Sequence, residues 1–234
     1  MMNIQYYYTN PDRGQVPKKK SSSFILMAIA SVLVVILMIF LIGTLVSGWE
    51  VHGFIPQDVD ISKDIDISKE PLQKQYEGEN FIINSFDDRY TLTPVAIYEI
   101  SAKVVSIRTY KDEMQVSPID LCTVWGQMAG EPNISYSQSE RFCSYYYRSV
   151  PYFGEYYMIS HSSNNHIIPA SGNVSSALNS MRVNDKVTLK GFLINVKNEK
   201  GNSWKTSLTR YDSGYGACEI IYVTEIRTEN RIWK

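Results

Sequence analysis

An unbroken apolar run near the N-terminus constrains this chain more than any other feature. Residues 24–46 read FILMAIASVLVVILMIFLIGTLV and contain no charged side chain. A helix over these residues would be about 34 Å long, enough to cross the roughly 30 Å hydrocarbon core of a bilayer. The run is longer than the roughly 7–15-residue core of a signal peptide, and it follows a leader at residues 1–23. We therefore predict a single transmembrane helix at Phe24–Val46 that acts as an uncleaved signal anchor.

The charges beside this run predict its orientation. Arg13 and three consecutive lysines, residues 18–20, precede the run, whereas Lys63 is the only Lys or Arg in the 20 residues after it. Because Lys and Arg are retained on the cytoplasmic side, the N-terminus should be cytoplasmic and the C-terminal domain exported. The lipid bilayer is thus an expected partner. Gly43 and Ser47 are small residues four apart, so the span could also pack against other helices as part of a larger membrane complex.

Charge also divides the chain after the span. Residues 50–88 carry ten acidic and three basic side chains, and we predict that residues 47–89 form an acidic linker with a short helix near residues 71–76. A short strand pair or a partner-binding segment is the alternative for this stretch. Residues 89–234 carry sixteen basic and thirteen acidic side chains. This small positive balance on the exported side makes nucleic acid an unlikely ligand class.

Residues 90–234 have the length of one domain and contain mainly strand-like segments. The expected strands are residues 90–110, 152–162, 185–198, 203–211 and 217–226, and the expected helices are residues 117–130 and 173–182. The change of apolar register across Gly191 predicts a bulge or bend in its strand. We predict a β-rich α+β domain, with an open barrel like that of oligonucleotide/oligosaccharide-binding (OB) proteins and short inserted helices as the first choice of fold.

The chain has three cysteines, Cys122, Cys143 and Cys218, all on the exported side. An oxidising compartment permits one disulfide, and Cys122 with Cys143 is the favoured pair among the three. Cys218 opens an apolar strand and is expected to be a buried small hydrophobe.

Two histidines five residues apart, His161 and His166, form the most conspicuous polar segment. In one interpretation the domain is a hydrolase or metal-dependent enzyme of the cell envelope that uses this loop. In the other, the segment is a hydrogen-bonded polar loop. The residues that would converge in the first case are Asp120, Trp125, His161, Asn165, His166 and Asp212. No residue is assigned a catalytic role, and no cofactor or metal is predicted.

Tyrosine is abundant, with 17 residues, and it is concentrated with arginine between residues 136 and 157. Aromatic faces suit stacking on sugars and contact with proteins, although strand and core packing is the alternative explanation. The candidate binding surface comprises Arg141, Tyr145, Tyr146, Tyr147, Arg148 and Tyr157. In a separate segment, the glycines at 214 and 216 indicate either a ligand-facing loop or a turn with positive φ before the last strand.

Four segments together give a resemblance: SPIDLCTVWG (117–126), ISYSQSERFCSYYY (134–147), ISHSSNNHIIPA (159–170) and SLTRYDSGYGACEIIYV (207–223). In these segments the chain resembles a bacterial family of membrane-anchored exported proteins of unknown function. The resemblance implies the bacterial cytoplasmic (inner) membrane as location, with the C-terminal domain in the periplasm. It implies no activity, substrate or catalytic residue.

These observations lead to one functional hypothesis. We expect a single-pass membrane protein whose exported domain binds a protein or an envelope component. The anchor, the small β-rich body and the absence of a recognisable catalytic motif in the sequence all favour a binding role.

Overall fold

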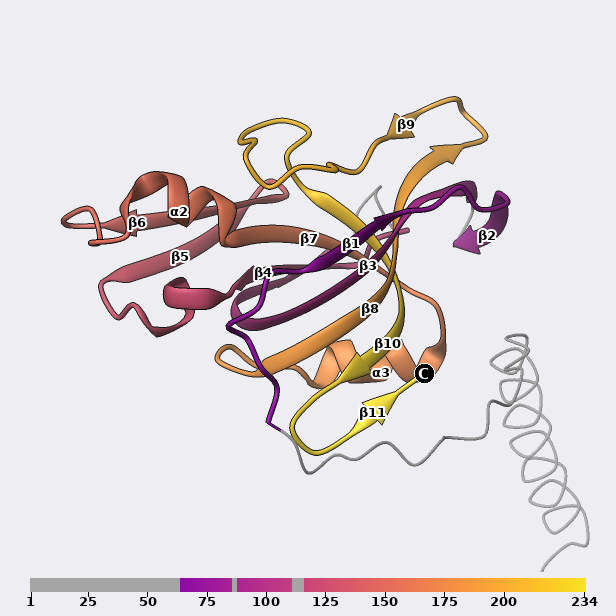
Figure 1. Cartoon of the computed structure of the whole chain (residues 1–234). Helices are drawn as coiled ribbons and strands as arrows, with labels where there is room; N and C mark the ends of the chain where they lie inside the picture. Colours follow the sequence, from indigo (N-terminus) through magenta and orange to yellow (C-terminus); the bar gives the residue numbers. More distant parts are fainter. Residues whose placement is uncertain (1–63, 86–87, 111–115) are drawn as a thin grey trace, which may run out of the picture. The chain divides into compact units, whose positions relative to one another are not determined.

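The computed structural model describes residues 64–85, 88–110 and 116–234, and strands predominate among them (Figure 1). The predicted leader, the transmembrane helix at Phe24–Val46, the pair Gly43 and Ser47, and the linker up to residue 63 lie outside the described residues. No helix among the described residues is both long and apolar enough to cross a membrane.

The longest strand, β3 (Asp88–Thr109), organises the sheet. Its even-numbered residues from Tyr90 to Val104 are buried while their neighbours are more exposed, which is the period-two pattern of a strand with one face on the core. One edge of β3 pairs with β8, and the other pairs with β4, β1 and β2. The strand predicted at residues 90–110 is confirmed.

Among the described residues, five strands pair in a closed ring of order β3-β4-β7-β10-β8, with β8 returning to β3. The other four are β4 (Ile119–Val124), β7 (Ser162–Pro169), β8 (Lys186–Asn198) and β10 (Glu219–Arg227). The pair β7–β10 is parallel and the other pairs of the ring are antiparallel. This arrangement confirms the strands predicted at residues 185–198 and 217–226.

The interior of the ring is a hydrophobic core that α3 (Gly172–Ser180) helps to cover. Leu121, Leu189 and Ile221 belong to this core, and α3 adds Val174 and Leu178. The helix begins where the Ser171 side chain accepts a hydrogen bond from the Val174 amide, as expected of a serine N-cap. The helix predicted at residues 173–182 is confirmed.

Four short strands extend the sheet beyond the ring. β1 (Leu72–Gln75) and β2 (Phe81–Ser85) pair with β3, β9 (Ser203–Trp204) pairs with β8, and β11 (Ile232–Trp233) pairs with β10. Residues 64–85 were assigned to the acidic linker, with a short helix near 71–76. Two short stretches of this segment, β1 and β2, instead join the sheet, in line with the alternative of a short strand pair, because they complete the hydrogen bonding of an otherwise open edge of β3. The return strand predicted at 203–211 is limited to its first two residues.

A separate lobe is inserted between β4 and β7. It contains the 3-10 helix η1 (Gly126–Gly130), the hairpin β5 (Ile134–Ser139) and β6 (Phe142–Tyr147), and the helix α2 (Gly154–Ser160). The hairpin and α2 project from the ring in Figure 1. Met128, Ile134 and Met158 form a small hydrophobic core within this lobe, separate from the core of the ring.

Two further predicted elements are wrong, and both lie around this insertion. Residues 117–130 were predicted as a helix, but β4 is extended there and all six of its residues are buried. The Ser-Pro start signal failed because β3 and β7 pair with both edges of this segment. Residues 152–162 were predicted as a strand, yet most of them form the helix α2. The helix buries Met158 on one face, and this packing outweighs the strand preference of its tyrosines.

The expected irregularity at Gly191 is present, but it lies on the partner strand. The register of β10 shifts between Val223 and Glu225, opposite Gly191. A Cβ atom on Gly191 would lie 1.9 Å from the carbonyl oxygen of Tyr222. Glycine is therefore needed because the β10 backbone passes too close for any side chain.

Candidate functional site

The outer face of β4 and β7 carries polar side chains that the β5–β6 hairpin covers. Asp120 and Cys122 of β4 lie opposite His166 and Asn164 of β7 in the strand register. All four are buried. Their burial follows from the position of the hairpin, since Gln138 near its turn donates to the side chain of Asn164 at 2.9 Å.

Arg141 at the hairpin tip anchors this cover. Glu140 and Arg141 have positive φ values of 48° and 69°, which allow a two-residue turn. The Arg141 Nη1 donates to Asp120 Oδ1 at 3.0 Å and to the Ser117 carbonyl at 2.8 Å. Its guanidinium lies 3.8 Å from the centre of the Tyr110 ring. The hairpin is thus held to the ring by a largely buried charge pair and a cation–π contact.

His166 completes this cluster from the other side. Its Nδ1 lies 2.8 Å from the same Asp120 oxygen, and its ring centre lies 4.4 Å from that of Trp204. The second oxygen, Oδ2, is buried without a hydrogen-bond partner among the described residues. Only 2% of His166 is exposed. The arrangement positions the hairpin and leaves no access for a substrate.

His161 occupies a different environment. It follows α2, its Nε2 lies 2.8 Å from Glu70 Oε1, and its ring stacks on Tyr157 with centres 3.5 Å apart. Trp125 joins this group, with its indole donating to Glu70 Oε2 at 3.4 Å. Five residues of nearly extended chain separate His161 from His166 by about 16 Å.

The candidate polar cluster therefore divides. Asp120 and His166 lie together, Trp125 and His161 lie together, and Asp212 accepts a hydrogen bond from Ser207 in the loop before β10. Within the residues that the structure describes, no three His, Cys, Asp or Glu side chains gather as a metal site would require. His161 and His166 therefore do not share a cleft that a hydrolase or metalloenzyme could use.

Asn165 belongs to a third group, on the inward face of the ring. Its Nδ2 donates to the Leu121 carbonyl at 3.2 Å and to Thr123 Oγ1 at 2.9 Å. These acceptors fix the amide orientation and leave Oδ1 facing Ser163 Oγ, 3.0 Å away. Ser163 also contacts the carboxyl of Glu219.

Glu219 is the titratable member of this group. The Ser163 hydroxyl has one proton to donate, and both Asn165 Oδ1 and the Glu219 carboxyl lie within its reach. Burial, with a smaller contribution from Asp212, raises the pKa of Glu219 to about 7, while Ser163 and Arg210 act to lower it. Glu219 is not among the site residues expected from the sequence; the available signal was an acidic residue inside an apolar strand.

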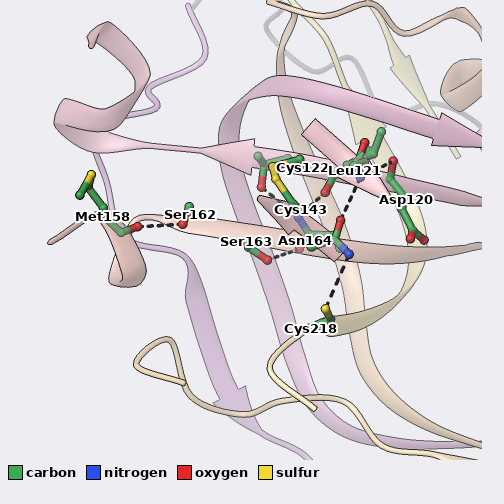
Figure 2. Close-up of a disulfide and its surroundings, with 12 residues drawn as sticks. Asp120, Leu121, Cys122, Cys143, Met158, Ser162, Ser163, Asn164 and Cys218 are labelled. Atoms are coloured by element: carbon green, nitrogen blue, oxygen red, sulfur yellow. Dashed lines mark hydrogen bonds between the residues drawn. A yellow bond between two sulfur atoms is a disulfide. The ribbon is translucent and has the colours of Figure 1, made fainter. Parts of the chain in front are cut away.

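The predicted Cys122–Cys143 disulfide is present, with Cα atoms 5.9 Å apart (Figure 2). It ties the hairpin strand β6 to β4. Cys218 has a free thiol, and it is half-buried rather than part of the core. All three cysteines line one cavity of about 130 Å³ between the hairpin, β7 and the loop before β10.

The candidate aromatic surface also divides. Tyr145, Tyr147 and Tyr157 are half-buried and pack on the core of the inserted lobe. Tyr146 and Arg148 are exposed. Arg141, which was expected on this surface, instead pairs with Asp120 in the buried cluster. The alternative explanation, ordinary packing, therefore applies to most of this set.

A different group of tyrosines is exposed, and we call it the tyrosine surface: Tyr152, Tyr156, Tyr211 and Tyr215, at 84%, 69%, 62% and 96% exposure. Tyr156 of α2 stacks on Tyr211 of the loop before β10, with centres 5.1 Å apart and planes 13° from parallel. Tyr215 meets Phe142 of β6 edge-on at 5.2 Å. Sequence reasoning missed Tyr211 and Tyr215, because nothing local predicts that their loop meets α2.

The glycines of this loop have the backbone conformation of turns. Gly214 and Gly216 have φ values of 82° and 87°, which agrees with the turn interpretation. The loop also holds Asp212 at the rim of the disulfide cavity. Comparison with models of known protein families, with curated proteins and with solved structures finds no match to this chain.

Proposed function

We propose that the described domain is a barrel of the OB type. Three features support this assignment. They are the ring order β3-β4-β7-β10-β8, the single parallel pair β7–β10, and the position of α3 between β7 and β8, which are the third and fourth ring strands in chain order. Numbered along the ring strands alone, the order is 1-2-3-5-4, that of a five-stranded Greek-key barrel. The extra strands and the inserted lobe are additions to this frame.

The inserted lobe changes where such a barrel can bind a ligand. OB barrels bind through the outer face of their second and third strands, which correspond here to β4 and β7. That face is buried beneath the β5–β6 hairpin. A partner must therefore meet the surface of the insertion and of the loop before β10, where the tyrosine surface lies.

The function supported best is that of a membrane-tethered, exported binding module without catalytic activity. Its ligand is a protein or an envelope component, and the span at residues 24–46 tethers it to the bacterial inner membrane with the domain in the periplasm. The observation that most directly supports a binding function is the tyrosine surface. Each of its four tyrosines is more than half exposed, and a tyrosine buries a large area on binding while losing little side-chain entropy.

The test replaces the stacked pair. The variant Tyr156→Ala/Tyr211→Ala removes two exposed rings from the tyrosine surface and should leave the core intact. The matched control is Leu72→Ala/Val183→Ala, which removes two side chains exposed at 57% and 51% on other elements. Full chains are purified from membranes after chemical cross-linking, and are also incubated with isolated cell-wall sacculi.

We expect the tyrosine variant to lose at least ten-fold in recovery of whichever component the wild-type chain retains. The control should retain it, and both variants should unfold at the wild-type temperature. Equal retention by the tyrosine variant and the wild type, with the fold intact, would exclude this surface as the binding site.

A further inference from the structure

The three sulfur atoms of this domain lie around one cavity. The cavity is lined by Cys122 and Cys143, which form the disulfide, and by the thiol of Cys218. Each comes from a different strand or strand end: β4, β6 and the residue before β10. A disulfide and a thiol that share a cavity are the two reactants of thiol–disulfide exchange.

Strand register shows which sulfur Cys218 can reach. Cys122 lies opposite Asn164, and Asn164 lies beside Cys218 because the parallel pairing matches Asn165 with Glu219. Two strand spacings therefore separate the Cα atoms of Cys122 and Cys218, about 10 Å. A disulfide tolerates about 7 Å, so these two cysteines cannot pair without movement of the sheet.

Cys143 is placed differently, because it belongs to the hairpin that lies over this row. The Arg141 carbonyl, two residues earlier in the hairpin, accepts from Asn164 Nδ2 at 2.8 Å and from the Cys218 thiol at 3.9 Å. Asn164 Nδ2 is also 3.6 Å from Cys218 Sγ. In Figure 2 the Asn164 side chain lies between the disulfide and Cys218. A swing of this amide would open the path between Cys143 and Cys218.

We propose that Cys218 is an exchange partner of the disulfide, so that the hairpin can transfer its covalent attachment from Cys122 to Cys218. The Cys218 thiolate attacks Sγ of Cys143, the Cys143–Cys218 bond forms, and the Cys122–Cys143 bond breaks. Cys122 leaves as a thiolate and takes up the proton that Cys218 lost. The number of disulfides is unchanged, so the step needs no oxidant or reductant.

The surroundings of Cys218 keep this step slow in the resting protein. Burial raises the pKa of Cys218 to about 11, opposed in part by Asn164. The thiol is therefore protonated at neutral pH, and exchange requires either higher pH or opening of the cavity. This inference goes beyond the proposed function, because it concerns the covalent state of the hairpin rather than the ligand.

The first experiment uses two single variants of the full chain, Cys122→Ser and Cys143→Ser. Each is oxidised with diamide under native conditions, and the disulfides are mapped by mass spectrometry. Cys122→Ser should form a Cys143–Cys218 disulfide, whereas Cys143→Ser should keep both remaining thiols free. Free thiols in both variants, or equal cross-linking in both, would overturn the proposal.

A second experiment uses the wild-type chain, since a variant that lacks the native disulfide can fold poorly. The oxidised protein is incubated at about pH 9, quenched with acid to stop exchange, unfolded, and alkylated with N-ethylmaleimide under mildly acidic conditions. A fraction of the label should appear on Cys122, and more of it after longer incubation. Label confined to Cys218 at every time would refute the exchange; the Cys218→Ser variant, which has no free thiol, should take up no label.

Discussion

Glu219 provides the sharpest test of the physical reasoning, because its protonation couples folding to pH. The carboxyl is buried at 5% exposure, and this burial raises its pKa to about 7. Replacing it by glutamine keeps the shape and supplies an N–H donor that cannot ionise. Glu219→Gln should therefore reproduce the protonated state at every pH.

The magnitude follows from linkage. The pKa of Glu219 is about 7 in the folded protein, compared with an ordinary value of 4.5. The folded state thus holds a proton that the unfolded state releases, so its contribution is fully present below about pH 4.5 and is lost as pH rises to about 7. A difference of 2.5 pKa units corresponds to about 3 kcal/mol of unfolding free energy.

The assay compares urea unfolding of the full wild-type chain and Glu219→Gln, followed by tryptophan fluorescence, from about pH 4 to pH 8.5. The stability of the variant relative to wild type should rise by about 3 kcal/mol across this range. Taking the difference cancels groups that titrate equally in both proteins. Glu229→Gln, at an exposed position, controls for the loss of one charge. A difference that is constant with pH would show that folding does not raise the pKa of Glu219.

Two further predictions concern the packing of the ring and its cover. Arg141→Ala should lower the unfolding free energy by about 3 kcal/mol in urea titration, because it leaves buried Asp120 without its cation, whereas Arg148→Ala at an exposed site should change it by less than about 0.5 kcal/mol. An equal effect of both would show that Arg141 does not hold the hairpin. Gly191→Ala should cost at least about 2 kcal/mol in the same titration, since its Cβ meets the β10 backbone, whereas Gly130→Ala, with open space around it, should be nearly neutral. Tolerance of Gly191→Ala would contradict the close approach of β8 and β10.

Elements with a clear local pattern were predictable from the sequence. The alternating run of β3, the strands at 185–198 and 217–226, and the serine-capped α3 were all identified within a few residues. Each depends on contacts between residues close in sequence or on one exposed and one buried face. The elements that failed, β4 and α2, have local signals that tertiary contacts override.

The candidate site was less predictable, because its members meet across long sequence separations. Asp120 and His166 were singled out and do lie together, but His161 was separated from them by the extended conformation of β7. Arg141 was expected on a binding surface and is instead a buried anchor. Tyr211, 55 residues after Tyr156, stacks on it through a loop whose path no local pattern predicts.

The sequence by itself determined the periodic properties of this protein: the long apolar run at residues 24–46, the β-rich composition after it, and a shortlist of cysteine pairs. These follow from side-chain hydrophobicity and spacing, which are local quantities. Only the tertiary structure decided that the outer face of β4 and β7 is covered, that burial raises the pKa of Glu219, and that Cys218 shares a cavity with the disulfide. Each of these depends on burial by a distant segment, and burial sets both the pKa of a carboxyl and the partners of a thiol.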